Sequence, residues 1–194
     1  MERPAGLRTC IYDTVQLEAV INDMARQAAG LLRGRSRIAV IGILRRGAPL
    51  ADRLTAAMTQ RFGVPRPLRI DLSVKRYADD LSLLFPDTQL EDDERQAAID
   101  LAGHSLLVVD DVLYTGHSLL RVVDYLTRRQ PAEIRVATLV DRGAARLPMR
   151  ADVVGVRLDI APSDIIECNV PPYEPEFRIE LLQPGQIERP LPQA

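Results

Sequence analysis

The stretch LLVVDDVLYTGHSL, residues 106–119, decides the fold. Four apolar residues lead into two adjacent carboxylates, Asp110 and Asp111, and a Thr-Gly pair follows a few residues later. Apolar residues at helical spacing come next, so the pattern predicts a buried strand, a tight loop and a helix start. Such a loop points backbone N–H groups at a ligand, and the helix N-terminus adds a partial positive charge. The stretch therefore predicts a phosphate site with two acidic side chains beside it.

Strands and helices alternate on both sides of this stretch. Apolar periodicity predicts helices over 14–32, from Pro49 to Met58 and over 118–130, and β-branched runs predict strands over 37–43, 68–74, 133–140 and 153–156. This alternation predicts an α/β fold, with a mainly parallel central sheet flanked by helices. Because ligands of such sheets bind at the carboxyl ends of the strands, we expect the turns at 44–47, 110–118 and 141–143 to converge.

Three segments fall outside this alternation. Residues 1–13 are expected to form a polar leader. The long polar excursion from Lys75 to Gly103 predicts a functional lid, an excursion with its own hairpin, or disorder. The proline-rich segment from Pro162 onward holds a possible last strand at 177–182 and a mobile tail. The length of 194 residues suits one domain over 1–194, which we divide into a core over about 14–156 and a hood and tail over about 157–194.

Composition excludes several classes of protein. The chain is 46% hydrophobic and 27% charged with a net charge of -2, so it has no global basic bias towards nucleic acid. Two cysteines, Cys10 and Cys168, lie far apart and argue against a disulfide framework or a structural zinc site. No segment has the length of a signal peptide's apolar core or a membrane span. We therefore expect a cytoplasmic protein with no membrane partner.

The opening stretch also carries a family resemblance. Its apolar run, acidic pair, Thr-Gly and hydroxyl residue resemble the 5-phosphoribosyl diphosphate (PRPP) motif of type I phosphoribosyltransferases. The form DDVLYTG resembles one branch, the pyrimidine-operon regulator and uracil phosphoribosyltransferase (PyrR) family. The resemblance implies that Asp110 and Asp111 are catalytic and hold the ribose hydroxyls of PRPP through hydrated Mg²⁺. The implied ligands of the 5′-phosphate are Thr115, Gly116, His117 and Ser118.

Further motifs support the resemblance. The turn Arg45-Arg46-Gly47 resembles the family's pyrophosphate loop, although such a turn can also be a solvated surface turn. The fork of donors on an arginine side chain matches the geometry of phosphate oxygens, and Arg46 is the implied catalytic cation. The pattern of VDRG, LP, RAD and Gly over 140–155 is the most branch-specific match. The start of the lid, Lys75, Arg76 and Tyr77, resembles the family's lid, but Ala78 stands where the family has Arg.

The resemblance implies transfer of the 5-phosphoribosyl group of PRPP to uracil, giving UMP and pyrophosphate. Departure of pyrophosphate gives C1′ oxocarbenium character. The main tasks of the enzyme are therefore to neutralise the charge of pyrophosphate and to position the base. Tyr114 stands where purine-specific relatives have Asp, which favours a pyrimidine, but it can equally pack beneath the loop. The implied residues on the base side are Tyr114, Asp141, Arg142, Val156 and Arg157.

Two rival functions stay open. One is a pyrimidine-responsive RNA-binding regulator with little catalysis, and the other is a transferase for another base, since the chain diverges from the family after Gly155. RNA-binding members carry basic residues after VDRG, whereas Ala144 and Ala145 stand here and only Arg146 and Arg150 remain. The resemblance also implies a homodimer or a higher homo-oligomer.

Overall fold

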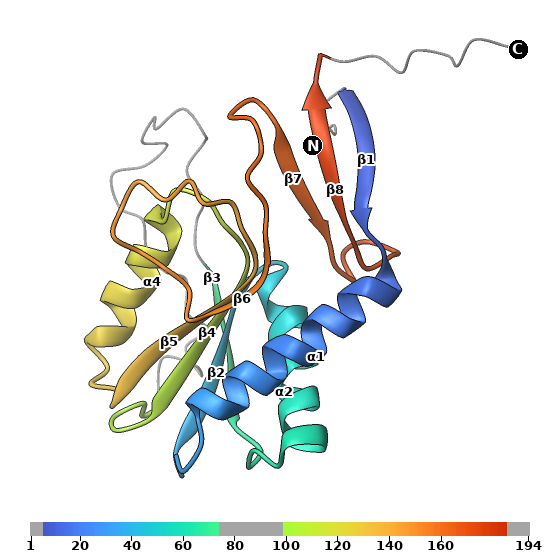
Figure 1. Ribbon diagram of the computed structural model, residues 1–194. Coiled ribbons are helices and arrows are strands. Elements are labelled where there is room, and N and C mark those ends of the chain that lie inside the picture. Colours follow the sequence, from blue (N-terminus) through green and yellow to red (C-terminus); the bar gives the residue numbers. More distant parts are fainter. Residues whose placement is uncertain (1–5, 74–98, 186–194) are drawn as a thin grey trace, which may run out of the picture.

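The central sheet of the computed structural model, which describes residues 6–73 and 99–185, is parallel (Figure 1). Within these ranges its strand order is β3-β2-β4-β5-β6. The strands are β2 (Ile38–Leu44), β3 (Leu68–Ser73), β4 (Ser105–Leu113), β5 (Glu133–Asp141) and β6 (Val153–Arg157). The helices of the described residues are α1 (Thr14–Leu31), α2 (Gly47–Phe62) and α4 (His117–Thr127). The predicted α/β fold is confirmed.

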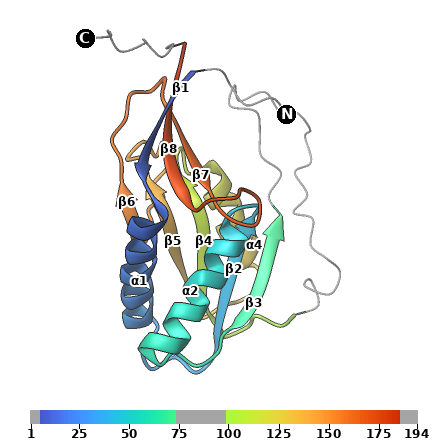
Figure 2. The ribbon, with the colours of Figure 1, turned by 90° about the vertical axis from the view of Figure 1, so that its right-hand side faces the viewer.

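Helices cover both faces of this sheet, as Figure 2 shows. Alternate residues of a strand point to opposite faces. On β4, Leu107 and Val109 pack with α1 and α2, while Leu106 and Val108 pack with α4. All four side chains are buried. Because helices cover both faces of β4, both sets of side chains are buried, which explains the uninterrupted apolar run at residues 106–109.

Local signals in the sequence set the helix ends. Asp13 caps α1: its side chain accepts the backbone N–H of Gln16 at 2.9 Å, and the Gln16 side chain accepts the N–H of Asp13 at 2.9 Å. Gly63 ends α2 with a left-handed φ of 67°. Gly116, with a φ of 87°, precedes α4. These ends lie within a few residues of the predicted bounds.

A second, smaller sheet is antiparallel and has the order β1-β8-β7. Its strands are β1 (Gly6–Tyr12), β7 (Ile165–Asn169) and β8 (Arg178–Pro184). The predicted last strand is confirmed as β8, but the prediction that residues 1–13 form a polar leader is wrong for β1, and β7 was not predicted. The partner of β1 lies at the other end of the chain, so no local pattern indicated the pairing.

The small sheet lies beyond the carboxyl end of β4, the end that carries the acidic pair. Cys168 of β7 is buried there, with its Sγ atom 4.0 Å from the carbonyl oxygen of Asp111. The small sheet therefore lies at the edge where ligands of parallel sheets bind.

Among the described residues, no helix has the length and apolar character needed to cross a membrane.

Candidate active site

The three turns that the sequence singled out converge at the carboxyl ends of adjacent strands. The turn at residues 44–47, here called the arginine turn, lies against β4: a Cβ atom on Gly47 would meet the carbonyl oxygen of Val109 at 2.5 Å. The turn after β5 lies on the other side of β4, where the backbone N–H of Arg142 donates to the carbonyl of Leu113 at 3.1 Å. The predicted convergence is confirmed, and glycine is required for the close approach at residue 47.

The acidic pair lies within β4, because the strand continues to Leu113. Asp111 is only 4% exposed, and Asp110 is half-buried. The carboxylates are tied to the backbone: Asp110 accepts the N–H of Asp111 at 2.9 Å, and Asp111 accepts the N–H of Val112 at 3.0 Å. Strand pleating directs the two side chains to opposite sides, so the pair is not one symmetrical cluster.

Arg46 joins the arginine turn to the acidic pair and to the small sheet. Its Nη1 atom lies 4.0 Å from Oδ2 of Asp111. Its Nη2 atom donates to Oε1 of Glu174 at 2.6 Å, and its Nε atom donates to the same oxygen at 3.2 Å. The hydrogen bonds with Glu174 raise the pKa of Arg46 above its ordinary value, against the opposing effect of burial. Arg46 is therefore a fixed cation beside the acids.

The predicted phosphate loop connects β4 to α4. His117 is the first residue of α4, and its Nδ1 atom lies 3.0 Å from the hydroxyl of Thr115. The carbonyl of Thr115 accepts the backbone N–H of Arg146 at 3.1 Å, and Gly116 packs against Met149. Ser118 is exposed. Thr115, Gly116, His117 and Ser118 thus surround a helix N-terminus, which attracts anions.

The predicted base-side residues form a connected group. The guanidinium of Arg142 lies 4.1 Å from the ring centroid of Tyr114 and donates to the carbonyl of Asp164 at 3.0 Å. Asp141 accepts the backbone N–H of Gly143 at 2.9 Å and lies 3.9 Å from Nε of Arg157. Tyr114 therefore stacks on Arg142. Val156 is buried in β6 next to this group.

Sequence reasoning missed two residues of this region, Tyr173 and Glu174. Both lie in the connection between β7 and β8, where proline density was the visible signal. Glu174 is 7% exposed, and a buried carboxylate needs a partner, which here is Arg46. The predicted lid residues Lys75, Arg76 and Tyr77 lie outside the described residues.

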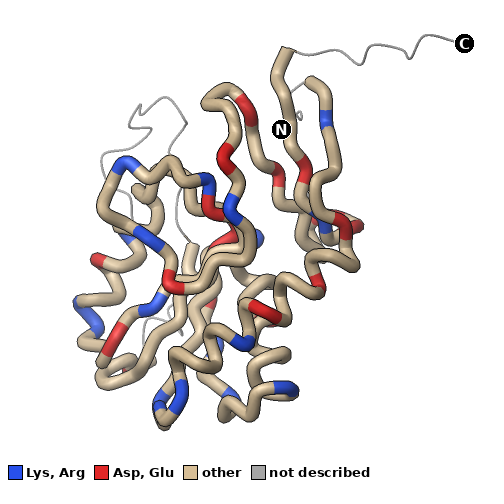
Figure 3. The backbone as a smooth tube through the Cα atoms, in the orientation of Figure 1, with Lys and Arg blue, Asp and Glu red and all other residues tan. Residues whose placement is uncertain are grey.

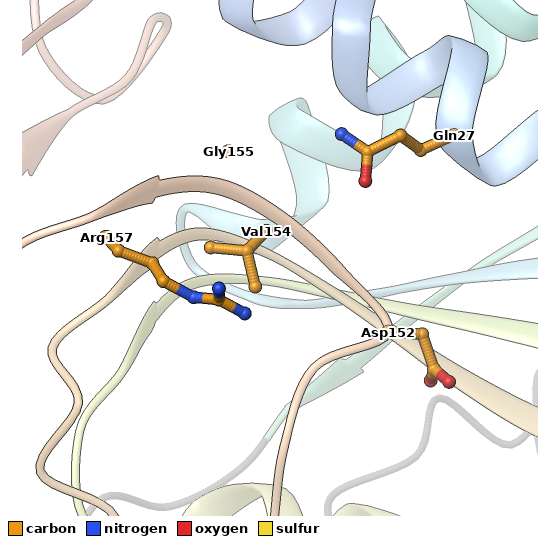
Figure 4. Close-up of a pocket in the computed structure, with 5 residues that line it drawn as sticks. All are labelled: Gln27, Asp152, Val154, Gly155 and Arg157. Carbon is orange, nitrogen blue, oxygen red and sulfur yellow. The ribbon is translucent and has the colours of Figure 1, made fainter.

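A pocket between α1 and β6 is separate from the predicted site residues, apart from Arg157, which is part of its lining (Figure 4). Its lining contains neither the acidic pair nor the arginine turn. The lining residues are Gln27, Asp152, Val154, Gly155 and Arg157.

The carboxylates of the acidic pair are of the chemical type that magnesium binds. No group of three or more His, Cys, Asp or Glu side chains that could hold a metal occurs in the described part of the chain. Mg²⁺ commonly needs only one or two carboxylates, with water and substrate phosphates completing its coordination. Asp110 and Asp111 supply such carboxylates, and when bound, the ion would neutralise phosphate charge.

The fold and this site define a class of protein. A family model of the phosphoribosyl transferase domain matches residues 8–176, so the chain belongs to the phosphoribosyltransferase family. Within that family it is PyrR-like. The bifunctional protein PyrR of Deinococcus radiodurans is 32% identical over 182 residues, which cover 93% of this chain and 98% of the relative. That of Thermus thermophilus is 32% identical over 172 residues, covering 88% and 93%.

Solved structures with this fold include hypoxanthine phosphoribosyltransferase from Trypanosoma cruzi in a ternary substrates complex. The TM-score is 0.74, with 19% identity over 92% of this chain and 96% of that one. At this identity the likeness shows the type I phosphoribosyltransferase fold alone.

Proposed function

We propose that this protein transfers the 5-phosphoribosyl group of PRPP to uracil, giving UMP and pyrophosphate. One observation carries the proposal: an acidic pair, an arginine turn and a Thr-Gly helix start meet at adjacent strand ends. PRPP presents two vicinal hydroxyls, a pyrophosphate and a 5′-phosphate. The three groups at the site match these three parts in charge and hydrogen bonding.

Each group has a role in the proposed reaction. Asp110 and Asp111 bind the ribose hydroxyls, directly or through hydrated Mg²⁺, and the backbone amides at the start of α4 bind the 5′-phosphate. Arg46 neutralises the charge that builds on pyrophosphate as the bond to C1′ lengthens. The base attacks C1′ from the opposite side, so the protein needs to position it rather than supply a covalent nucleophile.

The choice of uracil rests on the PyrR relatives and on Tyr114. This residue stacks on Arg142, so its ring helps to shape the base side without offering a carboxylate to a purine. The direct test is incubation of the purified protein with PRPP, Mg²⁺ and each common base in turn, measuring pyrophosphate release. Release with uracil alone supports the proposal, whereas release with hypoxanthine and not uracil contradicts the choice of base.

A second candidate is an RNA-binding regulator, in keeping with the word bifunctional in the relatives' name. Figure 3 shows positive residues on α4 and on the loop after β5, and the exposed ones include Arg128, Arg146 and Arg150. Phosphate contacts of this kind weaken steeply with salt. A salt-dependent shift of pyrimidine leader RNA would support this function, and no binding at low salt would exclude it. Sedimentation in the same buffer tests the homodimer or higher homo-oligomer that the resemblance implies.

A further inference from the structure

Two consecutive arginines meet two consecutive residues from the far end of the chain. The guanidinium of Arg45 lies 4.9 Å from the ring centroid of Tyr173, and Arg46 is hydrogen-bonded to Glu174, 128 residues away in sequence. Figure 2 shows the β7–β8 connection, which carries Tyr173 and Glu174, next to the N-terminal end of α2. The whole basic part of the arginine turn is therefore held by one short segment.

The contact with Glu174 is directional. Glu174 engages the Nε–Nη2 edge of the Arg46 guanidinium, whereas Nη1 lies on the side of Asp111. A guanidinium is planar with five donors in fixed directions, so holding one edge also fixes where the others point. Glu174 therefore orients the remaining donors of Arg46 towards the space beside the acidic pair.

Glu174 is itself held from several directions. Its Oε2 atom accepts the backbone N–H of Val170 at 2.8 Å. The segment is anchored at one end by fully buried Val170 and at the other by Phe177, which is 2% exposed and whose carbonyl accepts the hydroxyl of Thr14 at 2.8 Å. Because its position does not depend on Arg46 alone, Glu174 can determine the position of Arg46.

The carboxylate of Glu174 stays charged at neutral pH. Burial acts to raise its pKa, but hydrogen bonds from Arg46 and Val170 and the charge of Arg45 outweigh burial and hold the pKa below its ordinary value. A permanent charge-assisted pair is stronger and geometrically stricter than a neutral hydrogen bond. The ion pair between Glu174 and Arg46 therefore persists at neutral pH.

We propose that Glu174 is a positioning residue that, together with Tyr173, clamps the arginine turn in the geometry that receives pyrophosphate. The inference rests on the proposed function. The clamp also joins the segment between β7 and β8 to the pyrophosphate side of the site. A competing role, in which Glu174 occupies Arg46 and excludes pyrophosphate, predicts the opposite response to mutation.

Glu174→Gln tests the clamp with little change in shape. Binding of inorganic pyrophosphate with Mg²⁺, of PRPP with Mg²⁺ and of ribose 5-phosphate is measured by calorimetry for wild type and variant. We expect the dissociation constants for pyrophosphate and PRPP to rise at least about fivefold, because a misplaced binding group loses its ligand, while ribose 5-phosphate binds unchanged. A merely structural defect would weaken all three.

Glu167→Gln is the matched control. Glu167 also belongs to the small sheet and pairs with an arginine, Arg8, at 3.1 Å, but it does not touch the arginine turn. Tyr173→Leu is a second variant, and it should leave the fold intact because Tyr173 is 40% exposed. It should weaken pyrophosphate binding about two- to fivefold through loss of the cation–π contact with Arg45.

The outcomes separate the clamp from the proposed function. If wild type binds neither PRPP nor pyrophosphate, the proposed function is wrong. If wild type binds both and Glu174→Gln binds them equally well or more tightly, only the clamp is wrong.

In the free protein, ¹⁵N NMR of the Arg46 Nε–H group gives a readout without ligand. The exchange of this proton with solvent should speed up in Glu174→Gln and stay unchanged in Glu167→Gln. Unchanged exchange in Glu174→Gln would also overturn the clamp.

Discussion

Gly47 lies directly against the carbonyl oxygen of Val109, so that a single added carbon would come within 2.5 Å of it. This contact sets the distance between the arginine turn and β4. It also places Arg46 beside Asp111, because the acidic pair follows Val109 in the same strand. The spacing of the two charged groups thus depends on the absence of a side chain at residue 47.

Gly47→Ala should displace the arginine turn and weaken PRPP binding by up to about 100-fold, since a shift of about 1 Å is costly when geometry matters. The fold should lose about 1–3 kcal/mol from overpacking. Calorimetry with PRPP and urea unfolding measure the two effects. Gly30→Ala is the control, because no atom lies within 4 Å of its added Cβ, and this change within α1 should be neutral or stabilising. Normal PRPP binding by Gly47→Ala would contradict the assigned role of the contact.

The double variant Asp110→Asn with Asp111→Asn should abolish the stabilisation that PRPP gives to the folded protein. Amides keep the size of the side chains but cannot hold Mg²⁺ and the ribose hydroxyls as carboxylates do. Thermal melting with and without PRPP and Mg²⁺ measures the difference. Asp124→Asn removes an exposed carboxylate paired with Arg128 and should leave that difference intact. An unchanged PRPP shift in the double variant would show that the acids do not bind PRPP.

Glu133 should give the fold a stability contribution that is lost in acid. A hydrogen bond from Arg35 is the largest cause that brings its pKa down to about 2 from an ordinary 4.5, with smaller contributions from Ser105 and Arg135 and an opposing one from burial. The group titrates lower in the folded state, so its contribution is complete above 4.5 and disappears as pH falls towards about 2. Urea unfolding across this window should show a shallower loss of stability for Glu133→Gln than for wild type; equal slopes would rule the contribution out.

The two cysteines should differ sharply in reactivity. Cys10 is exposed, whereas Cys168 is buried and burial raises its pKa well above the ordinary value, helped by the charge of Asp111. Only the thiolate reacts with a disulfide reagent. Titration of the native protein should modify one thiol per chain rapidly and two after denaturation. Cys10→Ser should abolish the rapid phase, and rapid labelling of that variant would mean that Cys168 is accessible.

Much of the central sheet was predictable because its signals are local. Apolar runs and helical spacing fall on β2, β4, β5, α1 and α4, and glycines mark the ends of α2 and the start of α4. The convergence of the three turns followed from one rule, that parallel strands end at the same edge of a sheet. The small sheet was less predictable. Two of the seven residues in β1, Arg8 and Thr9, are polar, and its partner β8 lies at the opposite end of the chain.

The sequence by itself determined the class of fold and the position of the predicted phosphate loop between β4 and α4, because both depend on patterns within a few turns of chain. Only the tertiary structure decided that Glu174 pairs with Arg46, that β1 joins β8, and that pleating separates the carboxylates of the acidic pair. Such pairings depend on how distant segments are brought together. Neither periodicity nor residue type specifies which distant segments meet. The sequence therefore gave no sign that a proline-rich segment without a recognisable motif pairs with Arg46.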